Sequence, residues 1–412
     1  MTSHKYKAMN SEQKHNFINM AAVVTKDNIT TVSFDIFDTL VISPFWKSSD
    51  VYFLMEREFK NAYTGSKTFH ELRIKAESKA IKKCGLKKPT LEEIYCQLQK
   101  VSKISPASAE KLMNRELELI RYYSYPRDCG LRFYNEALDS GKKVVLTTDS
   151  YLPNETIGQI LKDCGIEGYK AVFIKNPEQL KRVNGSIFSI MISKLGLKHN
   201  ELVHVGGDLH EDVEVPVSQG IEAVYMPSTQ ELLKKSGRLV DYIHNKIGNS
   251  FEGVENLNLR CILSLYSEFA FDYPGAKITT GDFCGSYENM GFALSGTIGL
   301  LKDYAVSNEI ESKILAAFEK DKRFVTGKNT LIEMYEKHFD KFLEAYGYKN
   351  CDVIFKFFVK HAAINDTMYL QKYMSRFDMQ DWTNQITEPK VKSANNTEYH
   401  YKKSLFDKLF LR

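Results

Sequence analysis

Short apolar runs of strand length recur along the first part of the chain, with helical patterns between them. The runs are "TVSF" (31–34), "KVVLTT" (143–148), "AVFI" (171–174), "LVHVG" (202–206) and "EAVYM" (222–226). Most are separated by segments such as "NETIGQILKDCG" and "GSIFSIMISKLG", which have helical periodicity. Alternating strands and helices are typical of a parallel sheet covered by helices on both faces. We therefore predict a doubly wound, Rossmann-like α/β domain.

The segment between the first two predicted strands is different, because it holds several amphipathic helical patterns and no convincing strand pattern. One of these patterns, "TLEEIYCQLQKV", begins with Thr90 and Glu93 at the spacing of a capping box. We predict that residues 43–139 form a helical cap inserted into the α/β core.

The rest of the chain is predicted to be mostly helical. We place the α/β core at 29–42 and 140–248, after an N-terminal extension of residues 1–28. The stretch "NSFEGVENLN" (249–258) is polar and indicates a linker. Helical patterns dominate beyond it, so residues 249–412 are predicted to form an α-helical C-terminal domain, to which the sequence assigns no role.

Charge and hydropathy exclude some classes of partner. The net charge of +4 comes from 56 basic and 52 acidic residues that are spread along the 412-residue chain. Nucleic-acid backbones require a concentrated basic face, so we expect no nucleic-acid partner. The apolar stretch 290–301 is too short to cross a membrane, and the polar N-terminus lacks the apolar core of a signal peptide. We expect a cytoplasmic protein without a transmembrane segment.

Polar residues follow three of the predicted strands. They are Asp35 and Asp38, Thr148 and Asp149, and Gly206 to Asp208. Ligands of doubly wound sheets bind beyond the carboxyl ends of the strands, so we expect these residues to meet at one site. A basic pair, Lys181 and Arg182, precedes another helical pattern. A carboxylate nucleophile, a hydroxyl, a cation and an acidic loop for a divalent metal are the parts that phosphoryl transfer requires.

Four motifs together resemble those of the haloacid dehalogenase (HAD) superfamily. They are "FDIFDTLV", "VVLTTDSYLP", "LKRVNGSIF" and "HVGGDLHEDV", in the order and at the spacing of that superfamily. The chain is most similar to a bacterial branch that carries "FDIFDTL" and a helical cap and is commonly encoded among capsule and surface-polysaccharide genes. The resemblance covers roughly residues 29–227.

The resemblance implies roles for individual residues. Asp35 would be the nucleophile that forms an aspartyl phosphate. Thr148, with Asp149 beside it, would bind the transferring phosphoryl group, and the phosphate-binding cation would be Lys181 or Arg182. The implied cofactor is Mg²⁺, and its implied binding positions are Asp35, Phe37, Asp208 and Asp212.

The role of Asp38 stays open at the level of sequence. Most phosphatases of the superfamily carry a general acid two residues after the nucleophile, where this chain has Phe37. Asp38 stands one residue further on, and successive extended residues point in opposite directions. Asp38 is therefore the general acid if the loop bends, and a structural residue if it does not. We favour the general acid, because a second buried carboxylate is costly to keep without a use.

The resemblance implies a magnesium-dependent phosphatase acting on a small phosphorylated metabolite, with a sugar phosphate of surface-polysaccharide synthesis as the expected class. One alternative is a non-catalytic module that binds phosphate or recruits a partner, such as a glycosyltransferase, to a polysaccharide-synthesis complex. A third is a dehalogenase, which also has an aromatic residue at the position of Phe37 but has no use for a magnesium site.

Overall fold

The chain divides into two compact units, Met1–Ser228 and Thr229–Arg412. The computed structural model describes residues 23–24, 26–85, 88–175, 186–235 and 239–272, together with 333–334, 337 and 353. The first unit contains the predicted core and cap. The division falls earlier in the chain than the predicted boundary at residue 249, and the two units are described separately below.

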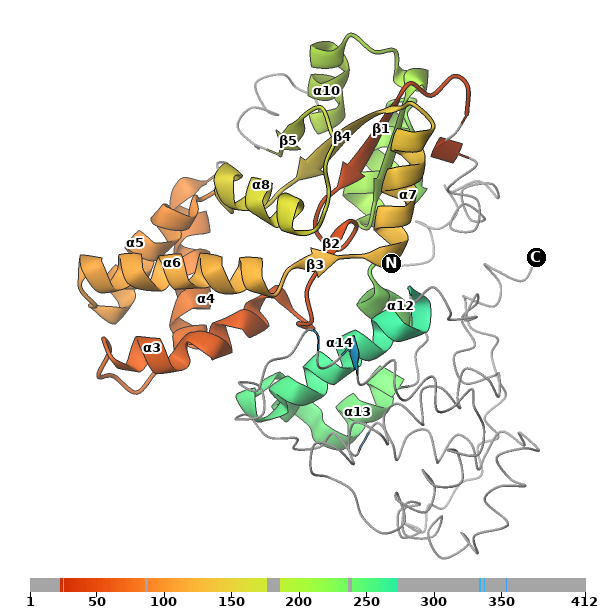
Figure 1. Ribbon diagram of the computed structural model, residues 1–412. Helices are drawn as coiled ribbons and strands as arrows, with labels where there is room; N and C mark the ends of the chain where they lie inside the picture. Colours follow the sequence, from red (N-terminus) through yellow and green to blue (C-terminus); the bar gives the residue numbers. More distant parts are fainter. Residues whose placement is uncertain are drawn as a thin grey trace, which may run out of the picture. The chain divides into compact units, whose positions relative to one another are not determined.

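Five parallel strands form the sheet of the first unit (Figure 1). The strands are β1 (Thr31–Asp35), β4 (Lys143–Thr148), β5 (Val172–Ile174), β6 (Leu202–Gly206) and β7 (Glu222–Tyr225), in the order β5-β4-β1-β6-β7. The chain runs outward from β1 to β5 and then crosses to β6 and β7 on the other side of β1. The predicted doubly wound α/β fold is confirmed, and this change of direction is where such sheets bind ligands.

Both faces of the sheet are covered by apolar clusters. Alternate residues of a strand point to opposite sides, so one strand contributes to both clusters. Val144 and Leu146 belong to one apolar cluster, and Val145 between them belongs to a second. The helices α7 (Asp128–Asp139) and α8 (Asn154–Asp163) contribute to the first cluster, and α10 (Ile187–Leu195) contributes to the second. Shorter elements complete the core: η3 (His199–Glu201), the π-helical η4 (Leu209–Glu214) and α11 (Val215–Ser218).

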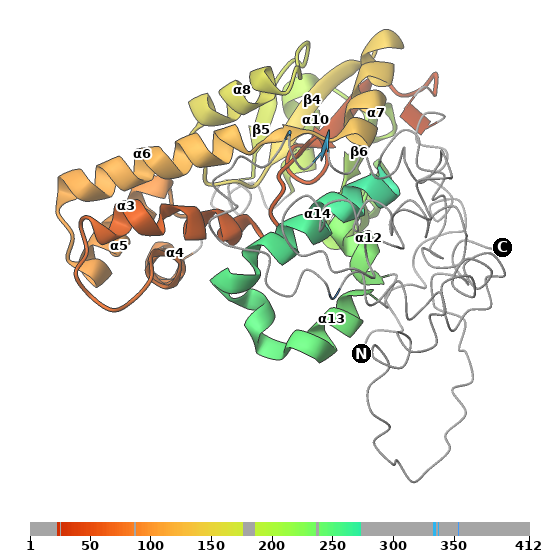
Figure 2. The ribbon, with the colours of Figure 1, turned by 60° about the horizontal axis from the view of Figure 1, so that its bottom comes forward.

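A helical cap is inserted after β1, as predicted. Its elements are η2 (Ser48–Met55), α3 (Glu56–Lys60), α4 (Phe69–Cys84), α5 (Leu91–Ser102) and α6 (Pro106–Tyr122), and Figures 1 and 2 show α3 to α6 gathered together. The chain enters the cap through β2 (Val41–Ile42) and leaves it through β3 (Tyr125–Pro126), and these two strands pair in an antiparallel ribbon. Both crossings between core and cap therefore run through one ribbon.

The helix α7 differs from the prediction, which includes residues 128–139 in the cap. Tyr134 and Ala137 of this helix are fully buried in the first apolar cluster of the sheet. The amphipathic pattern predicts a helix correctly, but it does not tell whether the apolar side packs on other helices or on a sheet. The capping box at Thr90 is confirmed, since Glu93 N–H donates to Thr90 Oγ1 and Thr90 N–H donates to the Glu93 carboxylate.

A buried charged cluster holds the cap helices together. Arg73 of α4 is fully buried and donates two hydrogen bonds, of 2.8 and 2.9 Å, to the carboxylate of Glu116 on α6. Its guanidinium also lies over the ring of Tyr52, 4.8 Å from the centroid. The Tyr52 hydroxyl is 3.2 Å from that of Tyr151, which belongs to the loop after β4. The cluster thus extends from the cap to the core.

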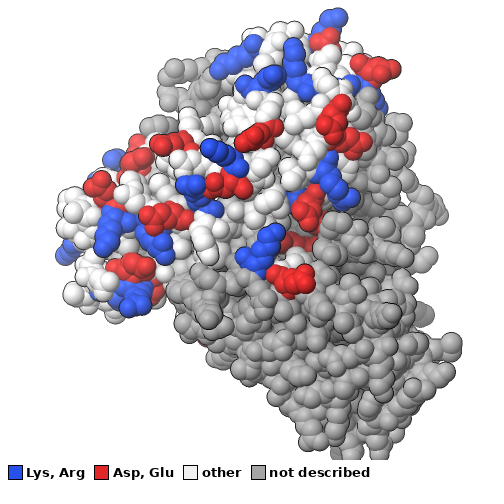
Figure 3. Space-filling model, viewed as in Figure 1, with Lys and Arg blue, Asp and Glu red and all other residues white. Residues whose placement is uncertain are grey.

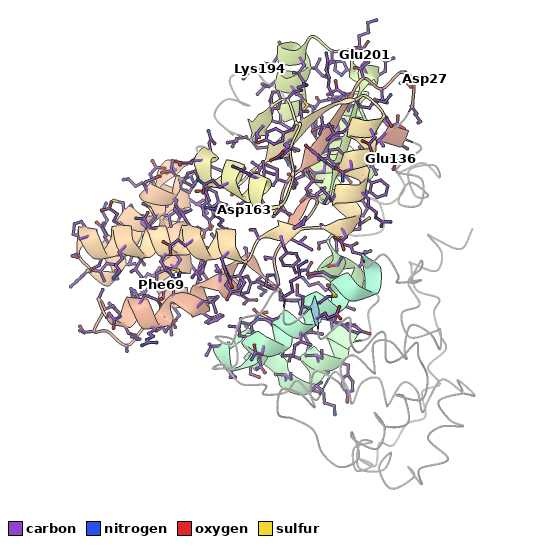
Figure 4. All side chains as sticks on the ribbon, viewed as in Figure 1. Asp27, Phe69, Glu136, Asp163, Lys194 and Glu201 are labelled. Carbon is purple, nitrogen blue, oxygen red and sulfur yellow. The ribbon has the colours of Figure 1, made fainter. Side chains whose placement is uncertain are left out.

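A second contact between core and cap lies on the surface. Asp163, labelled in Figure 4, is the last residue of α8, and its carboxylate accepts hydrogen bonds of 2.5 and 3.1 Å from Arg121 of α6. Both side chains are partly exposed, so this pair contributes little to stability compared with the buried cluster.

The second unit begins with α12 (Thr229–Lys235), α13 (Leu239–Ile247) and α14 (Leu257–Phe271). Hydrogen bonds from Gln230 to Ser264 and from Ser267 to Thr229 join α12 to α14. The linker predicted at 249–258 is wrong. This stretch falls largely on the short helices η5 (Gly248–Glu252) and η6 (Val254–Asn256), and Phe251 and Asn256 are buried. Most of the predicted C-terminal domain lies outside the described residues.

Within the described part of the chain, no helix combines the length and the apolar character needed to cross a membrane. Figure 3 shows that the acidic and basic side chains drawn in colour are interspersed on the face in view, over the cap as well as the core. Mixed charges of this kind give no single-sign field to attract a polyelectrolyte.

The buried ion pair in the cap leads to a stability prediction. Glu116→Ala leaves the Arg73 guanidinium buried without its main partner, so we expect it to lower the free energy of unfolding by about 3 kcal/mol. Glu118→Ala is the matched control, because Glu118 lies on the same helix but is exposed, and it should change stability by less than about 0.5 kcal/mol. Urea denaturation measures both values. Equal losses would contradict the importance of the buried pair.

Candidate functional site

The loop after β1 bends sharply. Asp35 is the last residue of the strand and is half-buried, and Asp38 adopts a left-handed conformation with φ of 60°. The Asp38 N–H donates to the Val41 carbonyl at 2.8 Å, which closes the bend. Aspartate tolerates this backbone region better than most residues. The Asp38 side chain is exposed, so the expectation of a second buried carboxylate is wrong.

The start of α7 holds this bend in place. Arg127 is fully buried; its Nη1 donates to the Asp38 carbonyl at 2.7 Å, and its N–H donates to the Leu40 carbonyl at 2.8 Å. Gly130 packs so closely on the loop that an added Cβ would lie 2.0 Å from the Thr39 carbonyl oxygen. The loop conformation therefore depends on a helix far along the sequence.

The loop after β4 lies beside the bend. Asp35 is paired with Thr147 across the parallel strands, so Thr148 follows one position later. Thr148 is buried, and its Oγ1 accepts a 3.1 Å hydrogen bond from the Ser150 N–H. Asp149 is exposed, and its Oδ2 accepts from Lys88 of the cap at 2.7 Å. The predicted hydroxyl and its acidic neighbour are thus brought to the carboxyl end of β1.

The loop after β6 carries the other two predicted carboxylates. Asp208 is exposed and caps η4, with its Oδ1 accepting from the N–H groups of His210 and Glu211 at 2.8 and 2.7 Å. Asp212 is buried, and its Oδ2 accepts from the Asp208 N–H at 2.9 Å. An added Cβ at Gly206 would lie 2.5 Å from Asp212 Oδ2. The glycine therefore makes room for the Asp212 carboxylate.

A cation that the sequence analysis missed lies among these carboxylates. Lys175 directly follows β5, its N–H donates to the Thr148 carbonyl at 2.7 Å, and its Nζ lies 3.3 Å from Asp212 Oδ1. The signal in the sequence that identifies Lys175 as a candidate is its position immediately after a predicted strand. Lys181 and Arg182, the predicted cations, lie outside the described residues.

Electrostatics set the ionisation of the three central groups. Burial raises the pKa of Asp35 well above its ordinary value, and the charges of Asp212, Asp149 and Asp38 raise it further, against the effect of Lys175. Burial would also raise the pKa of Asp212, but the hydrogen bond from His204, the charge of Lys175 and the hydrogen bond from the Asp208 N–H hold it well below its ordinary range. Burial would lower the pKa of Lys175, but Asp212 and Asp35 raise it, so this lysine stays charged.

The donor chemistry of the site fits Mg²⁺. Carboxylate oxygens are among the ligands that this ion prefers, and Asp35 of β1 and Asp208 and Asp212 after β6 carry carboxylates. The absence of a side chain at Gly206 leaves room for the Asp212 carboxylate. A divalent cation would relieve the repulsion between the Asp35 carboxylate and its acidic neighbours. In the part of the chain that the structure describes, no three His, Cys, Asp or Glu side chains are gathered closely enough to hold a metal as they stand.

No protein-family model matches the chain, and no curated protein matches it. Among solved structures, a haloacid dehalogenase-like family hydrolase from Xanthomonas campestris is 19% identical over 49% of this chain and 84% of its own, with a TM-score of 0.35. A structure described as a HAD-hydrolase from Bacillus subtilis bound to magnesium is 13% identical over 48% and 88%, with a TM-score of 0.34. The L-2-haloacid dehalogenase PA0810 is 13% identical over 48% and 84%, with a TM-score of 0.33. Likenesses at this level decide nothing about the reaction of this chain.

Proposed function

We propose that this protein is a HAD-type, magnesium-dependent phosphatase that hydrolyses a small phosphomonoester in the cytoplasm through an aspartyl-phosphate intermediate. The observation that supports this most is the half-buried carboxylate of Asp35 at the switch point of a parallel sheet, with Lys175 and Asp212 beside it. A nucleophile and a cation at the same edge of the sheet are what attack on an anionic phosphoryl group requires.

The residues of the site divide the work between them. Asp35 attacks phosphorus and forms the acyl phosphate, which water then hydrolyses. The hydroxyl of Thr148 and the charge of Lys175, with Lys181 or Arg182, stabilise the phosphoryl oxygens. Asp35, the Phe37 carbonyl, Asp208 and Asp212 would hold Mg²⁺, which would supply further positive charge when bound.

The bend at Asp38 bears on the first half of the reaction, in which the leaving group departs as the acyl phosphate forms. An extended loop would point the side chains of Asp35 and Asp38 in opposite directions, whereas the left-handed residue and its hydrogen bond to Val41 reverse the chain. The charge of Asp38 is also among the causes that raise the pKa of Asp35, as the smallest of them. We assign Asp38 as the general acid that protonates the leaving group.

The helical cap would exclude bulk water and select the leaving group, and we propose a sugar phosphate of surface-polysaccharide synthesis as the substrate class. Residues 249–412 would then recruit a partner such as a glycosyltransferase. The non-catalytic module and the dehalogenase are the competing outcomes of the experiments below.

Replacement of the nucleophile tests the enzyme assignment. Asp35→Asn should abolish phosphate release from sugar phosphates in the presence of Mg²⁺, because an amide does not form an acyl phosphate. Asp27→Asn, an exposed control labelled in Figure 4, should leave the rate unchanged. The screen includes halide release from 2-haloacids without metal. Halide release instead of phosphate release would establish the dehalogenase, and no turnover of either class would favour the non-catalytic module.

The same variant should stabilise the metal-free protein. The pKa of Asp35 is higher in the folded state than in the unfolded chain, so the folded state binds this proton more tightly. The resulting stabilisation is fully present at low pH and is lost as the pH rises through the folded pKa. At pH 7 in EDTA, Asp35→Asn should raise the free energy of unfolding by about 1 kcal/mol or more. The advantage should shrink toward pH 4 and on addition of Mg²⁺. Chemical denaturation at both pH values measures it, and a less stable variant at pH 7 would refute the repulsion.

Two substrates distinguish the roles of Asp38. Asp38→Asn should slow hydrolysis of a sugar phosphate by about a hundredfold, because its alkoxide leaving group needs a proton. It should slow hydrolysis of an aryl phosphate only slightly, because a phenolate leaves without one. Steady-state rates on both substrates are compared in one preparation. Parallel losses would show that Asp38 only shapes the loop.

A further inference from the structure

His204 is a fully buried imidazole in the middle of the central sheet, and the proposed reaction gives it no part. Its Nδ1 lies 3.0 Å from the hydroxyl of Ser33 on β1, and its Nε2 lies 3.2 Å from Oδ1 of Asp212 on η4. The ring of Phe188 packs edge-on against it, with the ring centroids 4.8 Å apart. Both nitrogens therefore have polar partners in an otherwise apolar setting.

The partners define which nitrogen carries the proton. An ionised carboxylate only accepts hydrogen bonds, so Nε2 donates to Asp212. Nδ1 then faces the Ser33 hydroxyl, which can donate or accept, and the imidazole is satisfied on both sides. An apolar side chain would fill the same space beside Phe188 without the cost of burying a polar ring, so packing alone does not account for a histidine here.

We propose that His204 is a positioning residue that holds the carboxylate of Asp212 ready for Mg²⁺. The proposal rests on the metal-dependent function above. Oδ2 of Asp212 is held by the Asp208 N–H over Gly206, and Oδ1 is held by His204 and Lys175, so the carboxylate is fixed at both oxygens. Partners of this kind orient metal ligands, and their loss commonly weakens metal binding by about 10- to 100-fold.

The position of Ser33 links the His204–Asp212 hydrogen bond to strand β1. Ser33 and Asp35 belong to the same strand, two residues apart, so their side chains start from the same face of the sheet. The hydrogen bonds between Ser33 and His204 and between His204 and Asp212 thus connect a metal ligand to the strand that carries the nucleophile. The separation of Asp35 and Asp212 is fixed through β1 and β6, which are paired directly.

Two amide variants separate the two hydrogen bonds of the ring. His204→Gln places an N–H donor near the position of Nε2, whereas the shorter His204→Asn reaches only toward Ser33. Mg²⁺ binding is measured by isothermal titration calorimetry on the full chain, and unfolding is followed in EDTA. We expect the Asn variant to bind Mg²⁺ about 10- to 100-fold more weakly than wild type and the Gln variant to stay within a few-fold. Ser33→Ala, which leaves the bond to Asp212 in place, should lose a few-fold, and His199→Asn on the surface should lose nothing.

Equal Mg²⁺ affinity in the Gln and Asn variants, or unchanged affinity in both, would overturn the positioning role even if both variants unfold more readily in EDTA. Absence of Mg²⁺ binding by the wild type would overturn the positioning role and the metal-dependent function together. Mg²⁺ binding without phosphate release by the wild type would overturn the phosphatase alone and leave the role of His204 to be decided by the variants.

Discussion

Repulsion between carboxylates at the carboxyl end of β1 is the interaction on which the rest of the site depends. Asp35 lies within the electrostatic reach of Asp212, Asp149 and Asp38, and among these groups Lys175 is the opposing charge. A parallel sheet brings such residues together, because the carboxyl ends of all its strands lie on one edge. The same repulsion that makes the free carboxylate costly makes the site receptive to cations.

Two fully buried arginines hold the loops around this charge. Arg127 fixes the bend after β1 through backbone carbonyls, and Arg73 anchors the tyrosine pair that reaches the loop after β4. A guanidinium suits both places, since its planar set of donors can satisfy several acceptors at once. Neither group has to belong to the candidate site in order to matter for it, because each determines the shape of a loop that carries site residues.

The sequence predicts the sheet and its strand ends well, because period-two burial and alternation with helices are local signals. Asp35 and Thr148 lie at the strand ends where those signals place them. Asp212, on η4, is implied only by the family resemblance. The predicted cations, Lys181 and Arg182, precede a helical pattern, whereas Lys175 directly follows a predicted strand. The exposure of Asp38 depends on Arg127, which is distant in sequence, and the buried Phe251 shows that polar composition alone does not identify a linker.

The ribbon of β2 and β3 gives the first unit a modular construction. Its two short strands bring the entry and exit of the cap side by side. Relative to the core, the whole insertion is therefore a loop whose two ends are held together. The entropy of closing a loop grows only with the logarithm of its length, so the core tolerates insertions of very different size at this point. A sheet built in this way keeps the arrangement of its strand ends while the inserted domain changes, which makes the cap an exchangeable part of the protein.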